Sequence, residues 1–104
     1  MLSYRIEITE PAAEDLADLR RYIRRTLEAP GTAFHIYERV KEAIQSLSCL
    51  PERNAVVQEA PYNEIGVRRM YVENYTVFYI TDSTAARVTI LRVLYSRRNW
   101  KSIL

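Results

Sequence analysis

Polar and apolar residues alternate at the start of the chain. In residues 3–8 the side chains of Tyr4, Ile6 and Ile8 fall on one face, and charged residues fall on the other. Alternation with a period of two residues is typical of a strand that is buried on one side. The pattern therefore predicts a half-buried strand over residues 3–8.

The segments that follow repeat with the period of a helix. Thr9 suits the N-cap of a helix and Pro11 suits its first turn. One apolar stripe contains Ala12, Leu16, Leu19, Ile23 and Leu27, and a second contains Ala33, Ile36, Tyr37, Val40, Ile44 and Leu47. These stripes predict helices over residues 10–27 and 32–48, with a break at residues 28–31. Because the link is short, we expect an antiparallel helical hairpin that packs its apolar stripes on a sheet.

Apolar segments also dominate the last third of the chain. The strands predicted there span residues 67–72, 75–81 and 87–95, preceded by a short edge strand at residues 55–58. Glu73 and Asn74 predict a two-residue turn, because asparagine tolerates a positive φ. The last strand is apolar on both faces apart from two arginines, so we expect it at the centre of the sheet. The order β-α-α-β-β-β predicts a single α+β domain over residues 1–104, with a helical hairpin packed on a mostly antiparallel sheet.

The charge of the chain is unevenly distributed. The net charge is only +2, but 13 of the 15 basic residues are arginine. Between Arg68 and Lys101 there are seven basic residues and only two acidic ones. Codon usage in a GC-rich genome would explain the preference for arginine over lysine, but not this clustering. The guanidinium group binds carboxylates and phosphates with two parallel hydrogen bonds, so the clustering predicts an anionic partner.

Several classes of function lack the residues that they need. Metal sites require clustered His, Cys or carboxylate groups, and the chain has one His and one Cys. With Gly31 and Gly66 as the only glycines, there is no phosphate-binding loop. His35 lies within a predicted helix beside apolar residues, where a surface or packing role is expected. We therefore expect no metal and no cofactor.

The same composition predicts where the protein resides. No apolar run approaches the ~20 residues of a membrane span, and the start of the chain has acidic residues but no apolar signal region. The single Cys49 cannot form an internal disulfide. These features favour a reducing, cytoplasmic location without membrane contact.

Arginine and tyrosine remain as candidates for chemistry. Arginine can stabilise the transition state of RNA cleavage, and a tyrosine can transfer a proton if its pKa, about 10 in model compounds, is tuned. The residues that fit this role are Arg69, Arg92, Arg97, Arg98 and Tyr95. In the alternative, structural interpretation, the tyrosines of the strands pack in the sheet and the arginines form solvated ion pairs.

Arg92 requires a partner in either interpretation. It interrupts an apolar strand, and burying an unpaired guanidinium group is costly. We expect an opening onto a cleft or an ion pair with Glu59, Glu64 or Asp82. Glu14 and Asp15 have a separate explanation, because acidic groups are stabilised at the N-terminus of a helix.

The sequence resembles the RelE/ParE superfamily of bacterial type II toxins, and the ParE branch in particular. The resemblance spans essentially the whole chain. It rests on TEPAAEDL at the first helix, LSCLPER after the second, IGVRRMYVENYTVFYI in the hairpin and VTILRVLYSRRNW in the closing block. It implies a toxin that is silenced by an antitoxin encoded beside it. RelE-like members cut mRNA on the ribosome, whereas ParE-like members inhibit DNA gyrase.

The resemblance also implies site residues. Arg68 and Arg69 match the paired arginines of the family's hairpin, and the closing block is matched at Arg92, Arg97, Arg98 and Trp100. Tyr95 stands where a histidine is common, and the lysines that RelE-like enzymes use for proton transfer are missing. These residues are therefore expected to contact the target or the antitoxin. Arg92, Tyr95, Arg97 and Arg98 would be catalytic only in an RNase.

The main hypothesis is a non-catalytic gyrase inhibitor that forms a hetero-oligomer with its antitoxin and meets operator DNA only through it. The alternatives are a ribosome-dependent mRNA endonuclease and a non-toxic, antitoxin-binding regulatory module. An acidic, partly apolar antitoxin segment is expected on the arginine-rich face. The terminal residues Trp100, Ile103 and Leu104 are expected either to pack on the helices or to form part of the toxic surface, with packing favoured for Trp100.

Overall fold

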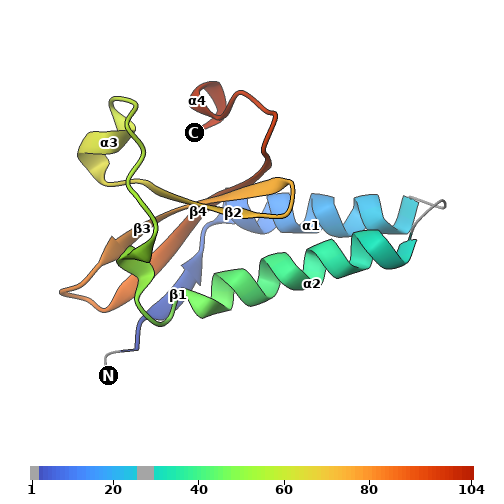
Figure 1. Cartoon of the computed structure of the whole chain (residues 1–104), viewed down its shortest axis with the longest axis horizontal. Helices are drawn as coiled ribbons and strands as arrows, with labels where there is room; N and C mark the ends of the chain where they lie inside the picture. Colours follow the sequence, from blue (N-terminus) through green and yellow to red (C-terminus); the bar gives the residue numbers. More distant parts are fainter. Residues whose placement is uncertain (1–2, 26–29) are drawn as a thin grey trace.

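A computed structural model describes residues 3–25 and 30–104 of the chain (Figure 1). Its elements are, in chain order, β1 (Arg5–Ile8), α1 (Glu10–Arg25), α2 (Pro30–Ser46), the 3₁₀ turn η1 (Pro51–Arg53), α3 (Tyr62–Ile65), β2 (Arg68–Val72), β3 (Tyr75–Asp82), β4 (Arg87–Tyr95) and α4 (Trp100–Ile103). The predicted order of strands and long helices is confirmed. In the described part of the chain, no helix is long and apolar enough to cross a membrane.

The four strands form one mixed sheet. Their order is β1-β4-β3-β2, with β1 parallel to β4 and the other neighbours antiparallel. The α+β class and the central position of the last strand are both confirmed. The edge strand expected at residues 55–58 is reduced to a single bridge between Val56 and Arg68.

The helical hairpin covers one face of this sheet (Figure 1). Its core consists of Ala12, Leu19, Val40, Ile44 and Leu47 from the helices, and of Met70, Val77, Tyr79, Val88, Ile90 and Val93 from the strands. The helical stripes therefore pack as their spacing predicts. The side chains of Ile23, Leu27 and Ala33, which also belong to these stripes, lie outside the described part of the structure.

A second apolar cluster covers the opposite face of the sheet. It contains Val57, Val67, Phe78 and Leu94, with Tyr62 and the terminal residues Trp100, Ile103 and Leu104 packed against it. In Figure 1, α3 and α4 lie near each other, away from the helical hairpin. The tail thus packs on the sheet and α3, which corrects the expectation that it packs on the two long helices.

Four residues in the described part of the chain have a positive φ, which most residues avoid: Leu50, Gly66, Glu73 and Ala86. The turn between β2 and β3 places the positive φ at Glu73, at 55°, and not at Asn74 as expected. Gly66 ends α3 with a φ of 85°, and its N–H binds the carbonyl oxygens of Tyr62 and Asn63. Glycine adopts this left-handed conformation without the steric cost that a Cβ atom would add.

A register shift changes the direction of β4 near its middle. Phe78 pairs with Arg92 and Tyr79 pairs with Ile90, so Leu91 is an extra residue on β4. The pairing of β1 with β4 ends at Ile8 and Ile90. Beyond that point the start of α1, and not a strand, lies beside β4, and this arrangement positions the groups described next.

Candidate functional site

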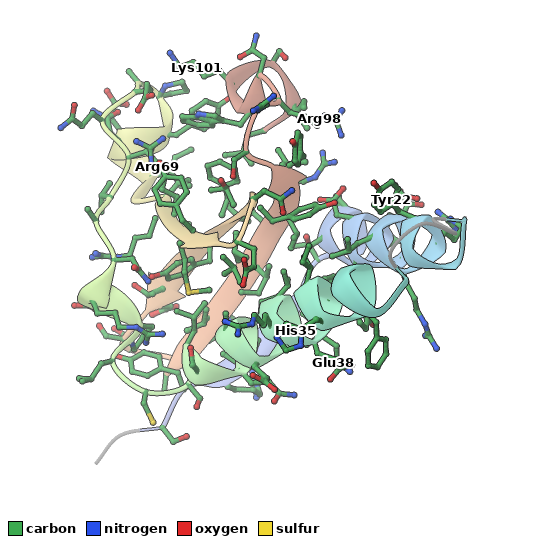
Figure 2. The ribbon with its side chains drawn as sticks, turned by 45° about the vertical axis from the view of Figure 1, so that its right-hand side comes forward. Tyr22, His35, Glu38, Arg69, Arg98 and Lys101 are labelled. Atoms are coloured by element: carbon green, nitrogen blue, oxygen red, sulfur yellow. The ribbon has the colours of Figure 1, made fainter. Side chains whose placement is uncertain are left out.

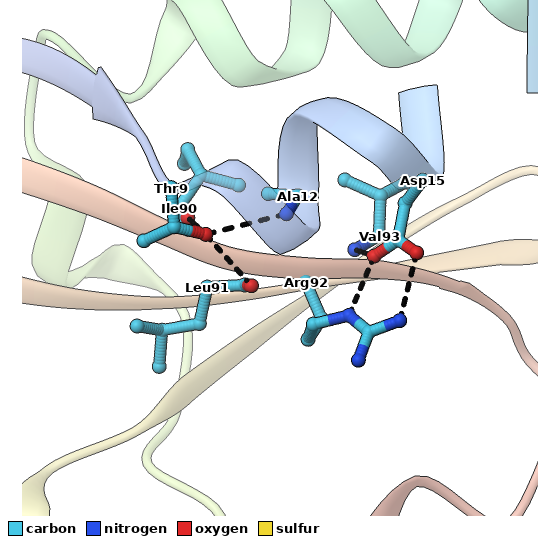
Figure 3. A network of polar contacts seen from close by, with 7 residues as sticks. All are labelled: Thr9, Ala12, Asp15, Ile90, Leu91, Arg92 and Val93. Atoms are coloured by element: carbon cyan, nitrogen blue, oxygen red, sulfur yellow. Dashed lines mark hydrogen bonds and ion pairs between the residues drawn. The ribbon is translucent and has the colours of Figure 1, made fainter. Parts of the chain in front are cut away.

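Thr9 connects the start of α1 to the part of β4 where its pairing with β1 ends. Its backbone N–H donates to the Ile90 carbonyl oxygen at 3.1 Å. Its hydroxyl lies 2.9 Å from the Ile90 and 3.0 Å from the Leu91 carbonyl oxygen, and it accepts from the Ala12 N–H at 3.3 Å (Figure 3). Thr9 is therefore the cap that the sequence predicts, and it also binds the edge of β4 that no strand covers.

Asp15 binds the next part of the same edge. The guanidinium group of Arg92 donates from Nε to Oδ2 at 2.7 Å and from Nη2 to Oδ1 at 2.8 Å (Figure 3). The backbone N–H of Val93 donates to Oδ2 at 2.9 Å. The Asp15 side chain is only 8% exposed and that of Arg92 22% exposed. The Asp15 carboxylate, one turn and a half from the start of α1, thus accepts hydrogen bonds from the Val93 backbone N–H and from the Arg92 guanidinium group.

This pair corrects two expectations from the sequence. The partner of Arg92 is Asp15, whereas Asp82 faces Arg87 at 3.7 Å and Glu59 faces Lys101 at 3.9 Å. Hydrogen bonding to Asp15 is the largest cause that raises the pKa of Arg92 above its ordinary value. Asp15 is therefore more than a helix-dipole carboxylate, because it fastens α1 to β4.

The paired arginines of β2 have different environments. Arg68 donates from Nη1 to the carbonyl oxygens of Glu52 at 3.1 Å and Asn54 at 2.6 Å, and so holds the loop after η1. The Arg69 guanidinium group lies 5.6 Å from the ring centroid of Tyr71, a cation–π contact on the surface. Arg68 thus binds backbone oxygens of the fold, while the half-buried Arg69 contacts the exposed ring of Tyr71 on the same strand.

Tyr95, Arg97 and Arg98 follow one another at the end of β4. Tyr95 is 37% exposed, and its ring meets that of Tyr75 edge to face with centroids 5.8 Å apart. Arg97 and Arg98 are both exposed, and among the described residues neither has a carboxylate within 4.0 Å. These three residues keep their polar groups available to a partner.

Trp100 has a packing role, as favoured from the sequence. Its ring lies 5.0 Å from that of Phe78 and 5.4 Å from that of Tyr62, centroid to centroid. The Tyr62 hydroxyl donates to the Lys101 carbonyl oxygen at 2.9 Å, which closes the tail over α3. The aromatic contacts and this hydrogen bond hold the tail on the sheet.

The structure therefore divides the predicted site. Arg68, Arg92 and Trp100 serve internal contacts, Arg69 is half-buried beside Tyr71, and Tyr95, Arg97 and Arg98 are exposed. Figure 2 shows Arg69 and Arg98 well separated, with Arg98 on the same side as Tyr22 of α1. The exposed residues thus form a group at the end of β4, and Arg69 on β2 lies apart from it.

Two tyrosines of β3 have a raised pKa. Burial raises the pKa of Tyr75 and of Tyr79 above 10.0, so both phenols hold their protons more tightly than a general base would. In the described residues no group of three His, Cys, Asp or Glu side chains could hold a metal ion.

Asp15, Tyr22 and Tyr75 are the residues beside this site that the sequence reasoning did not assign to it. Together with Tyr95 and Arg98 they line a pocket of about 180 Å³ between α1 and the strands. The helical spacing of positions 15, 18, 19 and 22 puts these four on one side of α1, which was the available signal.

Known proteins place this geometry in a family. The chain has the fold of solved toxin–antitoxin proteins. It is 21% identical to a chain of the chromosomal ParDE system from P. aeruginosa, with a TM-score of 0.67 and coverage of 91% of this chain and 98% of that one. It is 24% identical to a chain of the RelBE2 complex from Mycobacterium tuberculosis, with a TM-score of 0.65 and coverage of 91% and 93%.

A chain of the archaeal RelE–RelB complex from Pyrococcus horikoshii has the same fold at 17% identity, with a TM-score of 0.59 and coverage of 92% and 98%. No curated protein matches the sequence. The family model described as ParE toxin of type II toxin–antitoxin system, parDE, matches residues 6–100. Because this match runs from β1 to the start of α4, the chain belongs to the ParE toxin family of type II toxin–antitoxin systems.

Proposed function

We propose that this toxin inhibits DNA gyrase in the cytoplasm and does so by binding, without a catalytic step of its own. The observation that carries the proposal is the division of the predicted site. Arg92 is held by Asp15, while Tyr95, Arg97 and Arg98 stay exposed at the end of β4. Exposed cations without an assembled acid–base pair favour binding a macromolecule over cutting one.

A cognate antitoxin is the second part of the proposal. The P. horikoshii neighbour of the same fold is a complex of RelE with RelB. For this chain we expect an antitoxin with an acidic, partly apolar segment, bound in a hetero-oligomer. Operator DNA would be contacted by the antitoxin and not by the toxin, which acts on the operator only as part of that complex.

The gyrase assignment is tested with purified components. The toxin is added to gyrase and relaxed plasmid, and the supercoiled product is followed on gels. We expect supercoiling to stop and cleaved DNA to accumulate, and we expect prior addition of the antitoxin to restore activity. Unchanged supercoiling by a toxin that still arrests growth would overturn the gyrase assignment.

The alternative is an mRNA endonuclease, which would use Arg92, Tyr95, Arg97 and Arg98. In that case, induced cells would contain mRNA cut at codon boundaries, and Tyr95→Phe would abolish toxicity without weakening antitoxin binding. A gyrase inhibitor instead predicts filamentous cells, a DNA-damage response and intact mRNA. Harmless overexpression would favour the non-toxic regulatory module.

A further inference from the structure

A small pocket opens between α1 and the strands, beside the exposed end of β4. Its volume is about 180 Å³, which is the scale of one large side chain and too small for a helix. Leu19, Val93 and Leu94 are among its lining residues. These residues come from α1 and β4, so the contact that fastens the two elements also shapes the pocket.

Three tyrosines form the aromatic part of the lining. Tyr75 and Tyr95 meet edge to face at 5.8 Å, and Tyr22 lies on α1, where it is 58% exposed. The pKa of Tyr75 is raised first by burial and then by electrostatic interaction with Tyr22 and Tyr95. Tyrosines grouped with apolar residues at a surface pocket are typical of a site that binds one anchoring side chain.

Of the charged side chains that line this pocket, the one that forms no ion pair with a described residue is positive. Two carboxylates line it, but Asp15 is bound by Arg92 and Asp18 forms an ion pair with Arg21. Arg98 also lines the pocket, and among the described residues it has no carboxylate within 4.0 Å. A partner that completes the electrostatics must therefore bring a carboxylate to Arg98.

We infer that this pocket is an anchor site for the antitoxin. One aromatic or branched aliphatic side chain of an antitoxin segment enters between Tyr22, Tyr75 and Tyr95. An acidic residue near that anchor in the segment binds the guanidinium group of Arg98. The inference rests on the proposed partnership with an antitoxin and adds the place and chemistry of the contact.

A peptide fits these observations better than a nucleic acid strand does. A strand that stacked a base on Tyr95 would bring its phosphates beside Asp15 and Asp18 as well as beside Arg98. A peptide places its single carboxylate at Arg98 and leaves an uncharged side chain near the two aspartates. The pocket also has a substantial apolar lining, which an apolar anchor covers.

The test measures the affinity of the chain for the purified product of the adjacent reading frame by calorimetric titration. Arg98→Glu and Tyr95→Ala are each expected to weaken binding by about tenfold or more. Tyr95→Phe keeps the ring and should recover most of the affinity that Tyr95→Ala loses. Arg20→Glu makes the same charge change at an exposed position of α1 outside the pocket and should change affinity less than about threefold.

The outcomes separate this inference from the proposed function. If the unchanged chain does not bind the product of the adjacent reading frame, the antitoxin partnership fails and this inference fails with it. If the unchanged chain binds but Arg98→Glu and Tyr95→Ala bind equally well, only the anchor site is overturned. If these two variants lose affinity for a single-stranded DNA probe and keep it for the protein, the pocket binds nucleic acid and the inference is also overturned.

Thermal unfolding of each variant, followed by circular dichroism, shows whether lost affinity reflects lost folding. Arg98 and Tyr95 are both exposed, so their variants should unfold within a few degrees of the unchanged chain. If Tyr95→Ala unfolds at a much lower temperature than the unchanged chain, the test depends on Arg98→Glu alone. Unchanged affinity in Arg98→Glu would still overturn the anchor site.

Discussion

Arg92 and Asp15 join the central strand to the first helix through two parallel hydrogen bonds of 2.7 and 2.8 Å. The two residues are 77 positions apart in the chain. The same carboxylate accepts from the Val93 N–H, where β4 has no neighbouring strand on that side. A side chain of α1 thus takes the place that the backbone of β1 would occupy if that strand were longer.

Removing the Asp15 carboxylate should be strongly destabilising. Asp15→Ala leaves a guanidinium group without its partner and a strand N–H without an acceptor, so we expect a loss of about 3 kcal/mol in the free energy of unfolding. Urea unfolding measures it. Asp18→Ala is the matched control on the same helix, because its exposed pair with Arg21 should contribute less than about 1 kcal/mol.

A double variant separates pairing from burial. If Arg92→Met is combined with Asp15→Ala, no unpaired charge remains, and the double variant should be less destabilised than the sum of the single changes. Additive losses would mean that the two side chains stabilise the fold independently.

Tyr79→Phe should lower the free energy of unfolding by about 1–2 kcal/mol at pH 7. The Tyr79 hydroxyl donates to the Pro51 carbonyl oxygen at 2.6 Å and accepts from the Asn54 amide at 3.1 Å, and the variant loses both bonds. Tyr71→Phe is the matched control, because the Tyr71 side chain is 64% exposed.

The cost of Tyr79→Phe should also depend on pH. Burial raises the pKa of Tyr79 above 10.0, so the unfolded chain releases this proton first as the pH rises. Below pH 10 this group contributes its full share to the stability of the unchanged chain. That contribution falls as the pH rises from there through the raised pKa. The variant lacks that loss, so its deficit should shrink between pH 7 and about pH 10.5. A deficit that grows over this range would contradict the assignment.

Trp100→Ala should destabilise the tail and the second apolar cluster by about 2–3 kcal/mol, because it removes two aromatic contacts and leaves Phe78 partly uncovered. Trp100→Phe should cost about 1 kcal/mol, since a ring remains. Trp100 is the only tryptophan, so its fluorescence in the unchanged chain reports whether the tail opens before the sheet unfolds. If the fluorescence shows that Trp100 becomes exposed to solvent at a lower urea concentration than the unfolding transition seen by circular dichroism, the tail opens separately from the sheet.

Salt should slow antitoxin association more than it speeds dissociation. Arg97 and Arg98 are exposed and meet the partner at long range, whereas apolar contacts resist separation. Between about 0.05 M and about 0.5 M NaCl we expect the association rate constant to fall by about tenfold and the dissociation rate constant to change by about twofold. Stopped-flow mixing measures both, and an association rate that is independent of salt would rule out charge steering.

The main elements of the fold could be predicted because their signals are local. The stripe that contains Val40, Ile44 and Leu47 repeats with the helical period, and all three residues are buried. The strand at residues 87–95 is apolar on both faces and lies at the centre of the sheet with those bounds. Periodicity over a dozen residues carries enough information for such elements.

The errors concern contacts between distant segments. The partner of Arg92 depends on where β1 ends and how the extra residue Leu91 turns the strand, and neither is written in the local pattern. The tail residue Trp100 had no periodic signal to show which face of the sheet it would cover.

In the turn after β2 the positive φ falls on Glu73, because the geometry of the two strands outweighs the local preference of Asn74.

The parallel pairing of β1 with β4 unites residues 5–8 with residues 87–90. The first strand and the helical hairpin precede β4 in the chain, so they are synthesised before their partner strand. Their apolar faces can be buried fully only after β4 has also been made, because β4 contributes to the same core. A fragment that ends before β4 would lack the strand on which β1 and the helical hairpin depend, and we expect it not to fold.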